Sequence, residues 1–167
     1  MIRSEPSLQL ARLVDATAIA EMSRVLIEAG LQWRWTAQRI TASIRAANVN
    51  VLVARIHDGI AGFAIMRYGD DVAHLDLLAV APAYRRAGIA RQLLQWLEKC
   101  AVVAGIFRID LELRAANTGA RLFYERMGYR AFVHLPVYYE GIEDAMRMSR
   151  NLWRGPADRG ASTLSLK

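Results

Sequence analysis

The sequence predicts a single α/β domain, of the α+β type, built on a central sheet that mixes antiparallel and parallel strands. The chain has 167 residues, which suffices for one domain with a sizeable core. Strand-like segments in the middle of the chain are joined by turn signals, which give antiparallel neighbours. Later strands are separated by amphipathic helical segments, which give crossovers and a parallel pair. The expected order is β-α-α-β-β-β-α-β-α-β-β.

The first half of the chain contains two predicted helices and four predicted strands. Asp15 and Thr36 stand where helix N-caps are expected, and Gly30 is the expected stop of the first helix. Asp58 and Gly59 form a hairpin turn signal between two alternating segments. The predicted helices cover residues 15–29 and 36–46, and the predicted strands cover residues 8–13, 50–57, 60–68 and 73–80.

The second half contains a longer amphipathic helix, in which Leu93, Leu94 and Leu97 recur at helical spacing. Asn117 is the expected N-cap of the last helix, which Gly128 closes. The predicted helices cover residues 88–104 and 117–127, and the predicted strands cover residues 107–114, 129–135 and 144–152.

The composition is that of an ordinary globular domain, with 54% hydrophobic and 23% charged residues. No apolar run is long enough to span a bilayer, and the N-terminus lacks the apolar core of a signal peptide. We therefore expect a cytoplasmic protein without membrane contact. The domain is expected to cover residues 1–153, and the polar tail over residues 154–167 to be disordered. Cys100, the single cysteine, is expected to be a small core residue rather than a nucleophile.

The net charge is +6, and all but two of the 22 basic residues are arginines. This balance favours anionic partners such as a phosphorylated cofactor, an acidic peptide or a nucleic acid. The arginines are scattered rather than gathered in one block, so a solvated surface explains them equally well. Nucleic acid is therefore not the expected partner.

The most informative stretch is a predicted phosphate cradle. An apolar strand ends at Val80, Pro82 follows, and Arg85-Arg-Ala-Gly-Ile-Ala90 leads into a helix. The first turn of a helix has free N–H groups that bind phosphates, and Gly88 lets the backbone approach closely. Neither the G-x-x-x-x-G-K-S/T nor the G-x-G-x-x-G phosphate loop is present.

This stretch resembles the Q/R-x-x-G-x-G/A motif of the GCN5-related N-acetyltransferase (GNAT) family. The resemblance covers about residues 50–152. It implies a sheet of about six to seven strands with a splayed fourth and fifth strand, flanked by about four helices. It also implies acetyl-coenzyme A (acetyl-CoA) as cofactor and an amine as acceptor. A bulge in the fourth strand would present backbone groups of Leu78, Ala79 and Val80 to the thioester and pantetheine. The pyrophosphate would be held by Arg85, Arg86, Ala87, Gly88, Ile89, Ala90 and Arg91.

Asn117, which is followed two helical turns later by Tyr124, resembles a second motif of the family. The resemblance implies that both residues face the cofactor, with Tyr124 as general acid for the departing thiolate. A phenol, with an ordinary pKa of about 10, can donate a proton at neutral pH. The structural alternatives are a packed tyrosine and an ordinary helix cap.

Glu112 is the candidate general base. The run Leu111-Glu-Leu-Arg-Ala-Ala-Asn117 resembles the protein N-terminal acetyltransferase subgroup, which includes the ribosomal-protein-alanine acetyltransferases and uses this glutamate as base. A water relay is the alternative, Asp110 and Asp76 are weaker candidates, and a surface ion pair with Arg114 or Arg108 is equally compatible with the sequence.

The acceptor site is expected near Tyr138 and Tyr139, in a stretch that resembles the same subgroup. Trp33 and Trp35, between the first two helices, either line a pocket or close the core. No cluster has the spacing of metal ligands. His57, His74 and His134 occur singly and are interpreted as structural.

These patterns predict an acetyl-CoA-dependent N-acetyltransferase that transfers acetyl directly in a ternary complex. The acceptor is a protein or peptide α-amine, or else a small amine such as a polyamine, an amino acid or an antibiotic. An inert acyl-CoA-binding regulatory module and an enzyme for a nucleic-acid-linked amine are the alternatives from other classes. The protein is expected to be a monomer or a homodimer.

Overall fold

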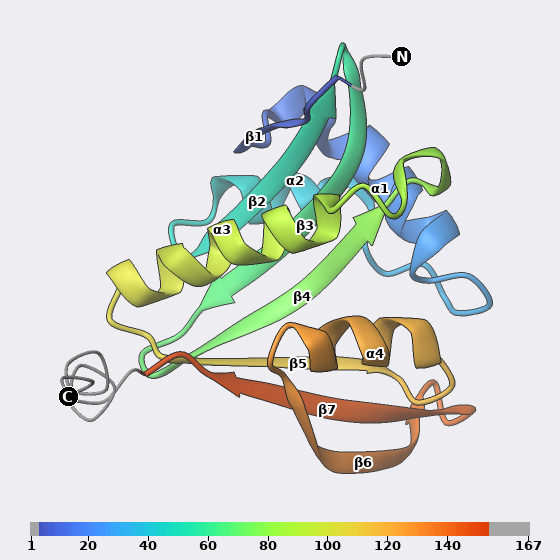
Figure 1. Ribbon diagram of the computed structural model, residues 1–167. Coiled ribbons are helices and arrows are strands. Elements are labelled where there is room, and N and C mark those ends of the chain that lie inside the picture. The colour runs from blue at the N-terminus through green and yellow to red at the C-terminus, as the bar shows by residue number, and fades with distance from the viewer. Residues whose placement is uncertain (1–3, 154–167) are drawn as a thin grey trace, which may run out of the picture.

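The computed structural model describes residues 4–153, which form one mixed seven-stranded sheet with helices on both faces (Figure 1). The strands are β1 (Ser7–Leu10), β2 (Val49–Ile56), β3 (Gly59–Tyr68), β4 (Val72–Val80), β5 (Arg108–Arg114), β6 (Arg130–Tyr139) and β7 (Glu143–Asn151). The helices are α1 (Ala16–Leu26), α2 (Ala37–Arg45), α3 (Ile89–Val103) and α4 (Thr118–Arg126). This confirms the predicted order and fold class. The predicted tail, residues 154–167, lies outside the described residues.

The strand order is β1-β2-β3-β4-β5-β7-β6, so β7 lies between β5 and β6. All neighbours are antiparallel except β4 and β5, which are parallel and joined through α3. Such a parallel pair needs the long crossover that α3 provides.

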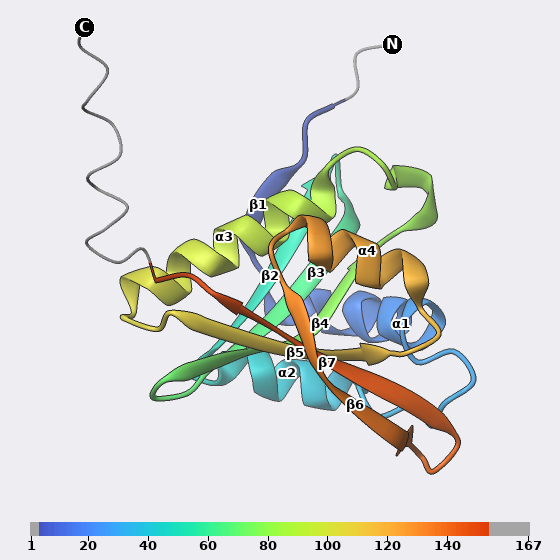
Figure 2. The same cartoon turned by 60° about the horizontal axis from the view of Figure 1, so that its bottom comes forward.

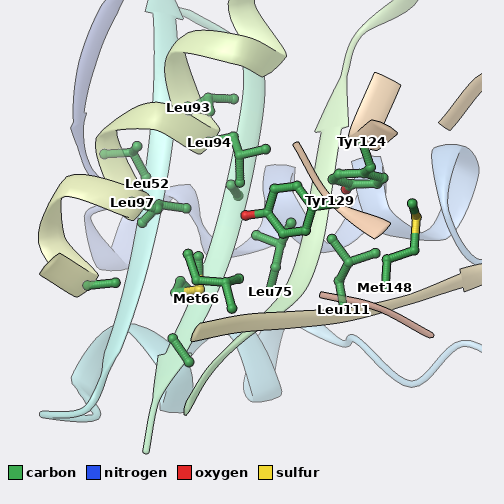
Figure 3. Close-up of a cluster of buried hydrophobic side chains, with 14 of the residues drawn as sticks. Leu52, Met66, Leu75, Leu93, Leu94, Leu97, Leu111, Tyr124, Tyr129 and Met148 are labelled. Carbon is green, nitrogen blue, oxygen red and sulfur yellow. The ribbon is translucent and has the colours of Figure 1, made fainter. Parts of the chain in front are cut away.

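The core has two layers, one on each face of the sheet (Figure 2). On one face, α1 and α2 bury Ile19 and Ile40 against Phe63 and other side chains of β2, β3 and β4. On the other face, α3 and α4 cover the cluster shown in Figure 3, where Leu94 and Tyr129 are fully or almost fully buried. Burying both faces of the sheet is what stabilises its mixed topology.

The parallel pair β4–β5 separates partway along its length. Pairing runs from Val72 opposite Arg108 to Leu75 opposite Leu111 and goes no further. Beyond this point β4 stays paired with β3 and β5 with β7, so the two strands diverge. This confirms the splay that the family resemblance implied. Within the described residues, the facing edges of the two strands have no partner strand there.

A β-bulge lies in β4, although not where the family resemblance placed it. Ile65 pairs with Leu77 and Met66 with Leu75, so Asp76 is the extra residue. Leu78, Ala79 and Val80 pair regularly with β3, which corrects the expectation of a bulge there. The bulge therefore lies beside the last β4–β5 pair, where added twist helps the strands to separate.

Three boundaries differ from the sequence prediction by three residues or more. Strand β1 ends at Leu10 rather than at residue 13, because a 3-10 helix over Leu13–Asp15 leads into α1. Helix α1 ends at Leu26 rather than at residue 29, because the N–H groups of Ile27 and Glu28 both donate to the Ser23 carbonyl and close the last turn. Strand β6 continues past Pro136 to Tyr139, with a register shift in this part. Proline is tolerated there because β6 is an edge strand.

A buried polar cluster ties α3 to β7. The Glu98 carboxylate accepts hydrogen bonds from Arg150 at 2.8 and 2.9 Å and from the Tyr129 hydroxyl at 3.0 Å. Burial raises the pKa of Glu98, and these two partners oppose that rise. The carboxylate thus has the partners that a buried charge requires.

Candidate active site

A cavity of about 540 Å³ opens where β4 and β5 diverge. Asp76 and Leu78 line it from β4, Glu112 lines it from β5, and Tyr124 lines it from α4. The α1–α2 loop and the β6–β7 hairpin complete the wall. The splay thus brings together residues that the sequence analysis selected from separate segments.

Glu112 is held in this cavity by two basic side chains. Its Oε2 lies 2.6 Å from His74 Nε2, and its Oε1 accepts from Arg147 at 2.8 Å. The hydrogen bond from His74 is the largest cause that lowers the pKa of Glu112; burial opposes it, and Arg147 adds to it. The predicted surface pairing with Arg114 or Arg108 is wrong, because Arg108 pairs with Asp110 and Arg114 with Glu143.

His74 is part of this cluster, which corrects its interpretation as an isolated structural histidine. Its Nδ1 lies 2.9 Å from Asp76 Oδ1, while Nε2 faces Glu112. Hydrogen bonds to Asp76 and then to Glu112 raise the pKa of His74 to about 9. His57 and His134 are not among the residues that line this cavity.

Tyr124 is 8% exposed and lies beside Tyr129 in the buried cluster (Figure 3). It packs edge-to-face against Phe123 and Tyr129, and it also lines the cavity. Burial raises the pKa of its hydroxyl, so the group is protonated at neutral pH. The packed and the cavity-facing interpretations of this tyrosine therefore both apply.

Asn117 likewise has two roles in the geometry. Its Oδ1 accepts from the N–H of Ala120 at 3.1 Å, which makes it the predicted N-cap of α4. It also lines the cavity beside Tyr124. The cap fixes where α4 starts and thereby the side of the cavity on which Tyr124 lies.

The predicted phosphate cradle forms the turn between β4 and α3. Gly88 is the N-cap of α3 with φ +77°, a conformation that favours glycine, and Arg86 has φ +60°. No side chain within residues 4–153 caps α3, and its first turn carries no acidic residue. Its N-terminal N–H groups, flanked by the exposed Arg85, Arg86 and Arg91, are suited to a phosphate.

The cradle and the β4 edge fit the doubly charged pyrophosphate and the elongated pantetheine arm of coenzyme A. The unpaired edge of β4 after Leu75 supplies backbone groups for an extended amide-containing arm. Leu78 lines the cavity, whereas Ala79 is buried beneath α1 and α2 and Val80 packs towards α3. The helix N-terminus lies at the end of the same edge.

Two loops build the part of the cavity wall where the sequence analysis expects the acceptor. Trp35, Tyr138 and Tyr139 line it, as the sequence analysis expected of a pocket. Trp33 does not; it is 41% exposed, and its indole N–H donates to the Trp35 carbonyl at 3.1 Å. Burial, and then the nearby Glu112, raises the pKa of Tyr139 to about 12.

Glu28 is a functional candidate that the sequence analysis missed. It lines the cavity with 7% exposure, and its carboxylate accepts from the Ser23 hydroxyl and from the N–H groups of Arg34 and Trp35. It therefore fixes the loop that carries Trp35. An isolated glutamate at a helix end gives no sequence signal for this role.

Among the described residues, no group of three histidine, cysteine or acidic side chains could hold a metal ion. Within the same residues, no helix has both the length and the apolar character needed to cross a membrane.

Comparison with known proteins supports the family. The model of the acetyltransferase (GNAT) domain matches residues 47–131, half of the chain, and this range contains His74, the cradle, Glu112, Asn117 and Tyr124. An uncharacterized N-acetyltransferase of Methanocaldococcus jannaschii, MJ1530, is 41% identical over 99 residues, covering 58% of this chain and 62% of the relative.

Two relatives with named acceptors or complexes are also similar. The ribosomal protein bS18-alanine N-acetyltransferase of Salmonella typhimurium is 36% identical over 95 residues, 55% of this chain and 64% of the relative. The catalytic subunit NAA20 of the N-terminal acetyltransferase B complex of Arabidopsis thaliana is 35% identical over 82 residues, 48% of this chain and 47% of the relative. The chain thus spans about half to two thirds of the curated relatives that it matches.

Solved structures agree on the fold. Ard1 from Thermoplasma volcanium superposes with a TM-score of 0.79 at 21% identity, covering 90% of this chain and 99% of that one. The ribosomal-protein-S18-alanine N-acetyltransferase of Escherichia coli gives a TM-score of 0.77 at 24% identity, covering 96% and 99%. With the splayed strands and the helix N-terminus in place, the chain belongs to the GNAT acetyltransferase family.

Proposed function

We propose that this protein is an N-acetyltransferase that transfers acetyl from acetyl-CoA directly to an amine in a ternary complex. The observation that carries the proposal is the splay of β4 and β5. It opens one cavity that is lined by Glu112 and Tyr124, and the free N-terminus of α3 follows directly after β4. A base, an acid and an anion site are the groups that acyl transfer from a charged thioester requires.

The cofactor is held, in this proposal, by the backbone. The N–H groups from Arg85 to Arg91 bind the pyrophosphate, and the β4 edge at Leu78, Ala79 and Val80 binds the pantetheine arm. Acetyl-CoA supplies an activated acyl group whose thiolate is the leaving group. Exposed arginines in the cradle add positive charge without requiring a lysine.

Tyr124 is the proposed general acid. Its hydroxyl is protonated at neutral pH, and the residue lines the cavity together with Asn117. From this position it donates its proton to the departing sulfur. Edge-to-face contacts with two aromatic rings hold the phenol in one orientation.

Glu112 is the proposed general base, acting directly or through one water. An acceptor amine arrives as an ammonium ion, which must lose a proton before it can attack. Glu112 is the cavity carboxylate on the strand opposite Leu78, so its position suits this role. The pKa of Glu112 is lowered, which makes it a weaker base and makes uptake of the ammonium proton less favourable. A neighbouring stronger base that takes this proton over from Glu112 would favour the transfer.

The proposed acceptor is the α-amine of a peptide or protein. Two relatives are named for protein acceptors or for an N-terminal acetyltransferase complex. Trp35, Tyr138 and Tyr139 provide an aromatic wall that can pack against a peptide's first residues. A small amine would contact less of this aromatic wall. Acetylation of a small amine and of no peptide would replace the proposed peptide acceptor.

The experiment is a coenzyme A release assay with a panel of acceptors. Peptides with alanine, serine and methionine at the first position are compared with spermidine, lysine and an aminoglycoside. Peptides blocked at the N-terminus but carrying a lysine side chain separate α-amines from side-chain amines. Turnover of free-N-terminus peptides alone supports the proposal. Turnover of one small amine and no peptide overturns the acceptor class, and binding of acetyl-CoA without any turnover overturns the enzyme.

A further inference from the structure

His74 bridges the two carboxylates that line the cavity from opposite strands of the splay. Its two ring nitrogens lie 2.9 Å from Asp76 and 2.6 Å from Glu112. Asp76 and Glu112 line the cavity, whereas His74 does not. The imidazole therefore lies behind the carboxylates, and its side chain is 26% exposed to solvent.

The charged groups around His74 come from the strands on either side of it and from β7. Arg67 of β3 binds Asp76 through two nitrogens, at 2.8 and 3.3 Å. Arg147 of β7 binds Glu112. Asp110 of β5 lies opposite His74 in register but is bound by Arg108.

The protonation state of His74 decides the net charge of this cluster. With a neutral imidazole, the two arginines balance Asp76 and Glu112. With an imidazolium, the cluster carries one positive charge beside the position where a cationic acceptor would bind. Like charges disfavour binding, so the neutral form suits an arriving ammonium ion.

We propose that His74 is a positioning residue that draws the acceptor's proton from Glu112 and delivers it to solvent, with Asp76 fixing its orientation. This inference rests on the proposed acetyltransferase activity. Asp76 keeps a proton on Nδ1, which leaves the lone pair of Nε2 directed at Glu112. The arrangement is that of a base oriented by an aspartate, placed behind the residue that touches the substrate.

The proton transfers balance in three steps. The ammonium of the acceptor gives one proton to Glu112 and becomes a neutral amine. Protonated Glu112 gives that proton to Nε2 of neutral His74, which regenerates the carboxylate and forms an imidazolium. The partly exposed imidazolium then loses its Nε2 proton to water, which restores the neutral ring with its proton on Nδ1.

The first experiment is a pH profile of kcat and kcat/KM for wild type, His74→Gln and Asp76→Asn with one peptide acceptor. Turnover of the wild type should rise with pH towards about 9, as His74 becomes neutral. Asp76→Asn should move this limb to lower pH by about one unit, because the largest cause of the raised pKa is removed. His74→Gln should lower kcat about tenfold or more and abolish the limb.

The pKa of the acceptor amine is the same for all variants. A limb of the pH profile that moves between variants therefore reports the titration of a group of the protein. Affinity for acetyl-CoA should change less than about twofold in His74→Gln, since His74 lies outside the cavity lining. His134→Gln is the matched control; it removes a histidine–aspartate pair of 3.0 Å between β6 and β7 and should leave the profile unchanged. An unchanged kcat and pH limb in both His74→Gln and Asp76→Asn overturns the inference.

The second experiment does not depend on activity. Titration of the His74 ring by NMR should give a pKa of about 9 in the wild type and lower values in Asp76→Asn and Glu112→Gln. A ring that titrates at the ordinary value of about 6.5 in all three proteins would mean that Asp76 and Glu112 do not bind it in solution, which overturns the inference. If the ring titrates as expected but no amine is acetylated, the proposed function fails and the bridge stands as a structural ion cluster. Because Asp76→Asn is isosteric, it keeps the test available if His74→Gln does not fold.

Discussion

The backbone N–H of Gln32 donates to the Glu140 carboxylate at 2.6 Å, across 108 residues of sequence. This bond joins the α1–α2 loop to the β6–β7 hairpin, and both residues line the cavity. The loop is also held from β5, because Arg114 donates to the carbonyls of Ile27 and Ala29 at 3.0 and 2.7 Å. The part of the cavity wall proposed for the acceptor is therefore assembled by hydrogen bonds between segments far apart in sequence.

Glu140→Ala should raise the KM for a peptide acceptor about three- to tenfold, because one charge-assisted hydrogen bond between the two loops is lost. The affinity for acetyl-CoA should remain within about twofold, since neither loop belongs to the cradle. Glu125→Ala, on the exposed face of α4, is the control. Equal changes in the KM for the peptide and in the affinity for acetyl-CoA would show that the Gln32–Glu140 hydrogen bond does not act specifically on acceptor binding.

Tyr124→Phe should lower kcat about a hundredfold, because the proposed proton donor is lost while the ring is kept. Its edge-to-face contacts with Phe123 and Tyr129 do not involve the hydroxyl, so thermal stability should change little. Stopped-flow or steady-state coenzyme A release measures the rate, and calorimetry measures acetyl-CoA affinity. A wild-type kcat in this variant would remove Tyr124 from the mechanism.

Gly88→Ala should weaken acetyl-CoA binding about tenfold. A Cβ at Gly88 meets no atom within 4 Å, so the strain comes from φ +77° alone and amounts to about 1–2 kcal/mol. Relief of this strain would turn the N–H groups of the cradle away from the pyrophosphate. Gly30→Ala is the matched control, because Gly30 has φ +80° and open space but lies in the α1–α2 loop. It should lower stability similarly and leave acetyl-CoA affinity unchanged.

The helices and strands were predicted well wherever local chemistry fixes them. Thr36 accepts the N–H of Arg39 and Asn117 accepts that of Ala120, so these two predicted caps are confirmed. The predicted cap at Asp15 is wrong, because its carboxylate makes no cap hydrogen bond to α1 and accepts from the Arg12 N–H and the Arg55 guanidinium instead. The end of α1 was wrong because Glu28 is buried among loop N–H groups rather than continuing the helix. That interaction depends on tertiary packing, which local propensity does not contain.

The site was only partly predictable for a similar reason. Glu112 and Tyr124 lie in motifs, whereas His74 meets Glu112 across 38 residues through the β4–β5 register. A signal was present: His74 and Asp76 are polar alternate residues within an apolar strand, so they share one face. Which strand lies beside that face, and where the bulge falls, is decided by sheet pairing.

Glu98→Gln should lower the free energy of unfolding by about 3 kcal/mol, because Arg150 would lose its buried carboxylate. The exposed pair Arg121–Glu125 on α4 provides the comparison, where Glu125→Gln should cost at most about 0.5 kcal/mol. Urea unfolding followed by circular dichroism measures both. Similar losses of unfolding free energy in the two variants would mean that the Glu98–Arg150 pair between α3 and β7 stabilises the fold no more than a surface ion pair does.

The raised pKa of His74 also predicts how stability depends on pH. The folded protein holds a proton on His74 up to about 9, whereas an unfolded chain loses it near 6.5. Between pH 6.5 and about 9 the folded state therefore binds more protons than the unfolded state. The stability that His74 contributes falls as the pH rises through this range. The difference in unfolding free energy between wild type and His74→Gln should be largest below pH 6.5 and shrink towards pH 10. A difference that stays constant from pH 6 to 10 would mean that His74 stabilises the fold by packing rather than by its charge between Asp76 and Glu112.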